Sequence, residues 1–190
     1  MHPLETLALA RSEFARRLEA VTPDDWPRAT PCDDWTVRDL VLHVVSGDRM
    51  AAALVRGATR AEATALRQMV DLGDDALAAF DAAADGLAAA FAEPGAFERM
   101  CAHPSGLFET GAQLLGLRIG DYALHAWDLA RAIGADETLD DAVVQTVWTA
   151  LQPVGPLIGS SGVFGSGSSE HLADDAPLQA RLLDLTGRRP

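Results

Sequence analysis

The sequence predicts an all-α protein built as a helical bundle. Hydrophobic residues make up 48% of the 190-residue chain and charged residues 23%, a balance typical of a globular domain. Alanine, leucine, arginine and glutamate, which favour helices, recur throughout, whereas aromatic residues amount to only 6%. Four long segments also place apolar residues at helical spacing, so each predicted helix has one hydrophobic face available for packing.

The first two predicted helices are separated by a segment that is not helical. Residues 3–20 combine apolar positions at helical spacing with arginine and glutamate between them. The stretch 22–35, TPDDWPRATPCDDW, is rich in proline and aspartate, so we expect a loop. Thr36 resembles an N-cap, and Asp39 three residues later resembles the partner in a capping box, which predicts a second helix to about residue 56.

The middle of the chain predicts two more long helices. Residues 74–92 keep the helical period, and residues 57–72 before them are expected to hold a short helix over a connection. Residues 96–111 break the pattern and predict an ordered loop or a short hairpin. The fourth helix is predicted over about 112–133, with Gly134 as its natural stop.

The C-terminal part of the chain is less regular. Residues 139–152 predict a helix that ends at Pro153. The following stretch, 153–176, is rich in glycine, serine and proline and predicts a long loop that is either mobile or a lid. A final short helix and tail, residues 177–190, form a C-terminal arm. There is no internal repeat, so residues 1–190 are predicted to be one domain.

Charge and cysteine content argue against several classes of function. The formal net charge is −13 and the pI is about 4.6, so phosphate backbones would be repelled and we expect no nucleic-acid partner. No run of eighteen apolar residues is present, so we expect no membrane span. The two cysteines, Cys32 and Cys101, are too few for a disulfide framework, and no signal peptide opens the chain. These features predict a cytoplasmic protein.

Acidic residues and a histidine share one side of the helix predicted over 112–133. Asp121 precedes His125 by four residues, and Asp128 follows three later. A lone carboxylate on a buried face costs on the order of several kcal/mol, so it requires a cation or another partner. His43, at the margin of the apolar stripe of the second helix, offers a third donor. Two imidazoles, one carboxylate and an open position suit catalytic zinc, and also ferrous iron, nickel or cobalt.

Simpler interpretations of these residues stay open at this stage. An Asp–His pair four residues apart on a helix is commonly a hydrogen-bonded or ionic pair, and a single histidine beside an apolar stripe is often a core residue. Asp128 is expected either to support a ligand histidine or to pair with Arg118, Arg131 or a backbone group. Gly47, one turn after His43, would leave room beside the imidazole at a cost in helix propensity of about 1 kcal/mol.

Other chemistry-bearing residues receive structural interpretations. Cys32 precedes the second helix, but no base is evident near it, so we interpret it as a packed cysteine. Arg118 and Arg49 are candidates to anchor a substrate carboxylate, although ion pairing or a surface position is the simpler expectation. The tryptophans are expected to be core or bundle-cap residues; they are Trp26, Trp35, Trp127 and Trp148.

Two segments resemble the signatures of a known family. TPCDDWTVRDLVLHVVSGDRMAAAL is similar to the N-terminal signature of the mycothiol-dependent maleylpyruvate isomerase-like metal-binding proteins, in the DinB/YfiT-like superfamily. GDYALHAWDLARAIG resembles their second signature, and the closing DDAPLQARLLDLTGRRP resembles the C-terminal segment of the actinobacterial subgroup. The resemblance covers nearly the whole chain and implies a DinB-like four-helix bundle, with extra short helices and a C-terminal arm in this chain.

The resemblance also implies a ligand set for a divalent ion. It places the family's metal ligands on His43, Asp121 and His125. The isomerases usually have glutamate at the acidic position, so Asp121 is one methylene shorter, and the ion would sit closer to its helix or be bridged by water. The isomerase also carries a further C-terminal domain that contributes to its active site. We expect no room for that domain before Pro190, which speaks against maleylpyruvate isomerisation itself.

The predicted function is therefore metal-dependent thiol chemistry. A divalent ion, zinc first of all, would activate a low-molecular-weight thiol such as mycothiol, and the metal-bound thiolate would attack an electrophile, giving a transferase or an isomerase. The alternative is a non-enzymatic metal-binding protein with a structural or sensory ion. A fourth protein ligand, from His103 or His171, would favour that alternative. The expected partners are a small-molecule thiol and an electrophile, with a homodimer if an apolar helix face is exposed.

Overall fold

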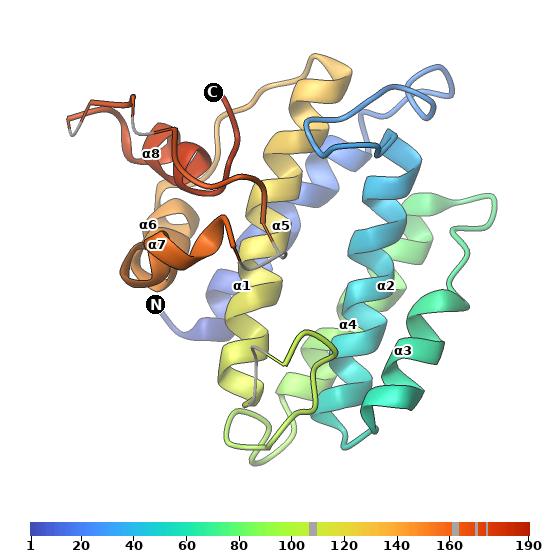
Figure 1. Ribbon diagram of the computed structural model, residues 1–190. Coiled ribbons are helices and arrows are strands. Elements are labelled where there is room, and N and C mark those ends of the chain that lie inside the picture. The colour runs from blue at the N-terminus through green and yellow to red at the C-terminus, as the bar shows by residue number, and fades with distance from the viewer. Residues whose placement is uncertain (107–109, 161–163, 170, 174) are drawn as a thin grey trace.

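The fold is helical, as the sequence predicts. Figure 1 shows the computed structural model, which describes residues 1–106, 110–160, 164–169, 171–173 and 175–190. Within these ranges the regular secondary structure consists of helices, and the β-pairing amounts to two isolated bridges. The helices, in chain order, are α1 (Pro3–Leu18), α2 (Val37–Val55), α3 (Arg60–Gln68), α4 (Ala76–Phe91), α5 (Gly111–Ile133), α6 (Asp141–Leu151), the 3₁₀ helix η1 (Gln152–Val154), α7 (Gly155–Ile158) and α8 (Leu178–Leu185).

The bundle is made by α1, α2, α4 and α5. Helix α5 packs against α1 and α2, while α4 packs against α2 and α1, so the four helices enclose a common core (Figure 1). Helix α3 lies on the outer side of α2, and α6 with α8 covers the opposite side next to α5. The position of α2 beside α5 is what matters for the site, because these two helices carry the predicted ligands.

The helix ends follow the capping chemistry of the sequence. The Thr36 hydroxyl accepts a hydrogen bond from the Asp39 N–H at 3.3 Å, and the Asp39 carboxylate accepts from the Thr36 N–H at 2.9 Å. This reciprocal pair confirms the predicted start of α2. Gly134 ends α5 with a φ of 72°, a left-handed conformation that glycine adopts without the steric cost a side chain would bring. The two helices of the site therefore have well-defined registers.

The irregular segments hold more helix than the sequence predicts. The stretch 153–176, expected to be a loop throughout, begins instead with the end of η1 and with α7. The prolines that suggested a loop occupy the first turns of these short helices, where a missing N–H leaves no hydrogen bond unmade. In the segment 96–111, Met100 and Thr110 form an antiparallel bridge. Residues 107–109, 161–163, 170 and 174 lie outside the described residues.

Aromatic side chains fill the centre of the bundle. Phe14 from α1, Phe80 from α4 and Tyr122 from α5 are fully buried, with ring centroids 5.0 to 6.4 Å apart. Burying rings of this size supplies much of the apolar contact that holds α1, α4 and α5 together. The Tyr122 hydroxyl lies at the edge of this cluster and extends it toward the polar groups of the site.

Membrane-spanning helices are absent from the described part of the chain. Not one of its helices combines the length and the apolar character that crossing a bilayer demands. The long helix α5 interrupts its apolar face with the charged residues of the site instead.

Candidate metal centre

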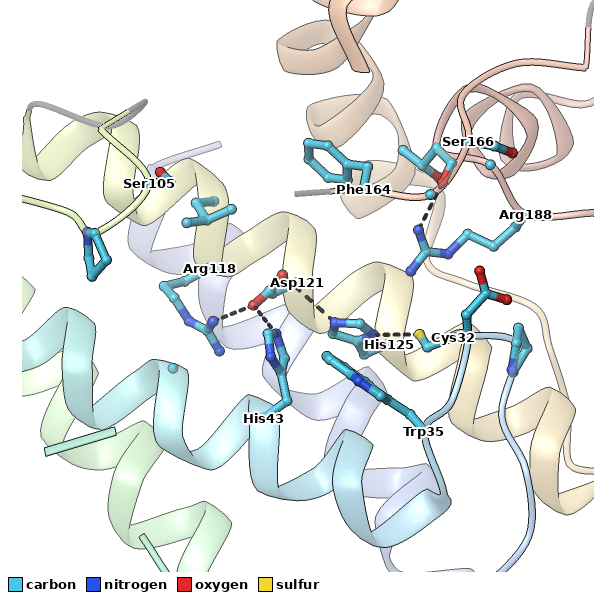
Figure 2. A pocket seen from close by; sticks show the side chains of 18 of the residues that line it. Cys32, Trp35, His43, Ser105, Arg118, Asp121, His125, Phe164, Ser166 and Arg188 are labelled. Atoms are coloured by element: carbon cyan, nitrogen blue, oxygen red, sulfur yellow. Dashed lines mark hydrogen bonds and ion pairs between the residues drawn. The ribbon is translucent and has the colours of Figure 1, made fainter. Parts of the chain in front are cut away.

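The predicted ligands meet on the facing sides of α2 and α5. His43 comes from α2, and Asp121 and His125 come from successive turns of α5 (Figure 2). The His43 Nε2 atom lies 3.2 Å from Asp121 Oδ2, and the His125 Nε2 atom lies 3.9 Å from Asp121 Oδ1. One ligand atom from each residue lies within 4.8 Å of the others. The three side chains that the sequence singled out thus form one cluster.

Trp35, in the loop before α2, packs beside this cluster. Its ring centroid lies 4.7 Å from that of His43 and 5.9 Å from that of His125, so the indole contacts both imidazoles (Figure 2). The sequence predicts that Trp35 is a core or bundle-cap residue, and it does not indicate the contact with the two imidazoles. The loop that carries it pairs back on itself through the Ala29–Thr36 bridge, a non-local contact that the sequence pattern does not reveal. Trp127, in contrast, is buried, as expected of a core residue.

Arg118 is the buried cation behind the cluster. Its Nε donates to Asp48 Oδ1 at 3.0 Å, its Nη2 donates to the Val44 carbonyl at 3.1 Å, and its Nη1 donates to Asp121. The Tyr122 hydroxyl completes the network by donating to Asp48 Oδ2 at 2.7 Å. Arg118 is therefore an ion-paired residue, the simpler of the two expectations for it.

Gly47 makes room for this arginine. A Cβ added at Gly47 would lie 2.9 Å from the Arg118 Cζ atom and closer still to Nη1. The expectation that Gly47 leaves space beside the His43 imidazole is thus corrected, because the space is filled by the Arg118 guanidinium. Arg49, the other candidate anchor, is exposed on α2 and does not line the cavity described below.

The electrostatics keep Asp121 ionised and His43 neutral. Burial alone would raise the pKa of Asp121, but the Arg118 guanidinium and the His43 ring reverse this effect and hold its pKa below the ordinary value. Burial lowers the pKa of His43, because the charged imidazolium loses water, and this outweighs the nearby carboxylate. An ionised carboxylate beside a neutral imidazole is the protonation state that metal ligation requires.

Asp128 contacts His125 on the side of the ring that faces away from Asp121. Its Oδ2 atom lies 2.9 Å from His125 Nδ1, so the Nδ1 hydrogen is directed at the carboxylate and Nε2 faces Asp121. Arg188, in the C-terminal tail, pairs with the same carboxylate at 2.7 Å. Asp128 thus contacts a histidine, as one expectation had it. Its arginine partner is neither Arg118, which pairs with Asp48 and Asp121, nor Arg131, which pairs with Glu137. The pairing arginine, sixty residues away, was not foreseen.

Cys32 lies next to this supporting group. Its Sγ donates to Asp128 Oδ2 at 3.3 Å and lies 3.9 Å from His125 Nδ1. Burial and then the Asp128 carboxylate raise the pKa of the Cys32 thiol to about 12. A thiol in this state is neutral at physiological pH and is a poor nucleophile. The structure therefore agrees with a packed cysteine, although it adds two polar neighbours that sequence reasoning did not find.

The cluster opens onto a cavity of about 630 Å³. Its walls include Trp35 and the three predicted ligands on one side, and Phe164 and Arg188 from the C-terminal part of the chain (Figure 2). His103 lines the cavity, whereas His171 is exposed and does not. The described residues 164–166, which belong to the predicted loop, thus border the site.

The donor set fits a divalent ion. Imidazole nitrogens and a carboxylate oxygen are ligand atoms that zinc accepts. The His43 Nε2–Asp121 Oδ2 and His125 Nε2–Asp121 Oδ1 separations of 3.2 and 3.9 Å would let one ion reach all three residues after small side-chain shifts. A second group, Cys32 with His125 and Asp128, also has converging atoms. It fits less well, because the buried Cys32 thiol holds its proton. His43, Asp121 and His125 are therefore the better candidates.

The fold and the cluster define a class: a helical bundle with two histidines and a carboxylate at the mouth of a cavity. A family model described as the mycothiol maleylpyruvate isomerase N-terminal domain matches residues 7–130. The chain belongs to this family. Two uncharacterized proteins of Mycobacterium tuberculosis, from strains CDC 1551 / Oshkosh and ATCC 25618 / H37Rv, are each 34% identical over 167 residues, covering 85% of this chain and 85% of each relative.

A solved structure confirms the predicted architecture. The crystal structure of the mycothiol-dependent maleylpyruvate isomerase superposes with a TM-score of 0.60 at 19% sequence identity. The match covers 76% of this chain and 65% of that enzyme. At this level of identity the likeness establishes the fold, and the DinB-like helical bundle expected from the sequence is confirmed.

Proposed function

We propose that the chain binds one divalent metal ion through His43, Asp121 and His125 and uses it in thiol chemistry. The observation that carries the proposal is the convergence of these three donors at the mouth of a cavity large enough for small molecules. The group of converging atoms includes neither His103 nor His171, the candidates for a fourth ligand. Three protein ligands that face a cavity favour a catalytic site over a coordinatively closed structural one.

The identity of the ion follows from the donor types. Two imidazole nitrogens and one carboxylate oxygen suit zinc, with iron, nickel or cobalt as alternatives. An ion at this site would supply the positive charge that favours the thiolate form of a low-molecular-weight thiol at neutral pH. Mycothiol is the proposed thiol, since the family and the solved relative both carry its name.

The residues of the chain would prepare the site before any ligand enters. Asp128 accepts the Nδ1 hydrogen of His125, which leaves the Nε2 lone pair of that ring available. Arg118 keeps Asp121 ionised and fixes one of its oxygens. Trp35 packs against both imidazoles, restricts their rotation and shields that side of the cluster from water. These contacts lower the reorganisation that ligand binding requires.

The proposed reaction joins the thiol sulfur to an electrophilic carbon. In a transferase, the new C–S bond replaces a bond to a leaving group, which departs with its electron pair. In an isomerase, the sulfur adds, the substrate rearranges and the sulfur is expelled again, so the thiol is regenerated. The cavity beside the cluster, about 630 Å³, has the size of a small-molecule site.

Metal analysis and a conjugation assay test the proposal in sequence. Purified protein should hold about one divalent ion per chain, as three converging ligands imply. His43→Ala and His125→Ala should lose the ion, whereas His2→Ala, at the N-cap of α1, should keep it. Conjugation of mycothiol to monochlorobimane should then require both the protein and the ion.

The outcomes separate the proposal from its rival. Metal-dependent conjugation above background supports an enzyme. A stoichiometric ion without conjugation for any low-molecular-weight thiol would favour a structural or sensory ion instead. A protein that stays metal-free after incubation with zinc would refute the site altogether.

A further inference from the structure

Arg67 differs from the other described arginines of the cavity lining because no described carboxylate pairs with it. Among the described residues, four arginines line the cavity, and three of them are ion-paired. The three pairs are Arg118 with Asp48 and Asp121, Arg188 with Asp128, and Arg189 with Asp184. Arg67, in the last turn of α3, has no carboxylate partner within the described ranges. Its charge is thus not balanced by a neighbouring carboxylate.

Arg67 instead contacts one of the proposed metal ligands. Its Nη2 atom lies 3.0 Å from His43 Nδ1. A guanidinium has only donors, so Nδ1 must be the acceptor, and the hydrogen of the neutral ring is on Nε2. That Nε2–H then donates to Asp121 at 3.2 Å. One imidazole therefore links Arg67 to the carboxylate of the candidate metal centre.

The hydrogen on His43 Nε2 would have to move to Nδ1 for a metal ion to bind at Nε2. A neutral imidazole that gives its Nε2 lone pair to a metal carries its hydrogen on Nδ1. The Nδ1–H and the Arg67 N–H would then be two donors facing each other, and the contact would be lost. Metal binding at Nε2 would therefore free the Arg67 guanidinium from its acceptor and leave it beside the cavity.

The surroundings favour an anion as the next acceptor. Arg67 is exposed near the end of a short helix, so its side chain has freedom to move. Its charge also acts on another residue of the cavity lining: after burial, Arg67 is the largest cause of the lowered pKa of His103. The whole chain carries a net charge of −13, which repels anions in general. An anionic ligand would therefore be attracted to this cavity by Arg67, whose charge no neighbouring carboxylate of the described residues balances.

We propose that Arg67 is a metal-dependent anchor for a carboxylate group of the ligand that enters this cavity. The inference rests on the proposed function, because the metal is what frees the guanidinium. A guanidinium binds a planar carboxylate through paired N–H donors. Of the four described arginines that line the cavity, Arg67 is the one whose guanidinium is not already paired with an acidic side chain, so a ligand carboxylate would not compete for it. Arg67 thus determines specificity for acidic over neutral ligands.

The test compares two thiols on cobalt-loaded protein. Cobalt(II) reports thiol binding through its absorption spectrum, and 3-mercaptopropionate differs from 3-mercapto-1-propanol in carrying a carboxylate. We expect wild-type protein to prefer the acid by about three- to tenfold at low ionic strength, and less at high salt. Arg67→Ala should abolish the preference. Arg49→Ala, an exposed arginine on α2 outside the cavity lining, should retain it.

Metal affinity provides an independent readout. Arg67→Ala should bind cobalt as tightly as wild type or a few-fold more tightly, because a positive charge and a competing donor to His43 are removed. An unchanged acid preference in Arg67→Ala, or no preference in wild type, would overturn this inference alone. A loss of cobalt comparable to that of His43→Ala would also overturn it. Absence of cobalt binding to wild type would overturn the proposed function together with it.

Discussion

Replacing Gly47 with alanine tests the network behind the cluster. A Cβ at this position would lie 2.9 Å from the Arg118 Cζ atom, well inside the ordinary contact distance of about 3.5 Å. Arg118 has little freedom to retreat, because its side chain is 3% exposed and is held by Asp48, Asp121 and the Val44 carbonyl. The added methyl group must therefore displace a buried, fully engaged guanidinium.

The expected cost follows from two opposing effects. Alanine is a better helix former than glycine, which would stabilise α2 by about 0.5–1 kcal/mol. Displacing Arg118 would leave the buried Asp48 carboxylate without its cation, a change that typically costs about 3–5 kcal/mol. Gly47→Ala should therefore lower the free energy of unfolding by about 2–4 kcal/mol.

Denaturant unfolding followed by circular dichroism measures this change. Gly116→Ala is the matched control, because Gly116 is exposed on α5 and a Cβ there would meet nothing within 4 Å. The control should be neutral or stabilising by up to about 1 kcal/mol. If Gly47→Ala proves as stable as Gly116→Ala, the guanidinium is not held in the place that the structure assigns to it.

Three further changes probe the buried polar groups. Burial would raise the pKa of Asp128, but hydrogen bonds and charges from His125 and Arg188 lower it to about 2. The ionised Asp128 carboxylate therefore stabilises the folded protein fully above about pH 4, and this stabilisation is lost as the pH falls toward 2. Asp128→Asn should lower stability by about 2 kcal/mol at pH 7 and remove that acid dependence; an unchanged pH profile would contradict the pairing. Cys32 should react with iodoacetamide at pH 8 at least about tenfold more slowly than a free cysteine, because its pKa is about 12, and peptide mapping distinguishes it from Cys101. Rapid alkylation would show a reactive thiol instead. Tyr122→Phe removes a donor to Asp48 and should cost about 1–2 kcal/mol in the same unfolding assay; no loss would mean that the hydroxyl contributes nothing to the network.

Local patterns were enough to predict the long helices and the approach of Asp121 and His125 on one side of α5. The capping box at Thr36 and the glycine at the end of α5 mark helix ends through contacts between near neighbours, which the sequence displays directly. Asp121 and His125 were found for the same reason, since a separation of four residues sets their relative position on α5. His43 stands out as a third donor by its position at the margin of the apolar stripe of α2, and the family resemblance supports it. Its approach to α5 is a tertiary contact that the sequence does not display.

The supporting residues escaped prediction because they are brought in by the tertiary fold. Arg188 reaches Asp128 across sixty residues, and Trp35 reaches both imidazoles from a loop. The sequence predicts that Gly47 leaves space beside His43, but that space is filled by Arg118, which comes from another helix. Arg67 was assigned only to a short helix over a connection, and nothing in its local sequence distinguishes it from the paired arginines. Contacts of this kind depend on how helices pack, which periodicity does not specify.

The most direct test of the central proposal is anomalous X-ray diffraction from crystals of the zinc-loaded protein. We predict a single strong peak per chain, about 2.0–2.2 Å from a nitrogen of His43, a nitrogen of His125 and an oxygen of Asp121. A peak at Cys32 and Asp128 instead, or no peak at any of these residues in fully loaded crystals, would contradict the proposal.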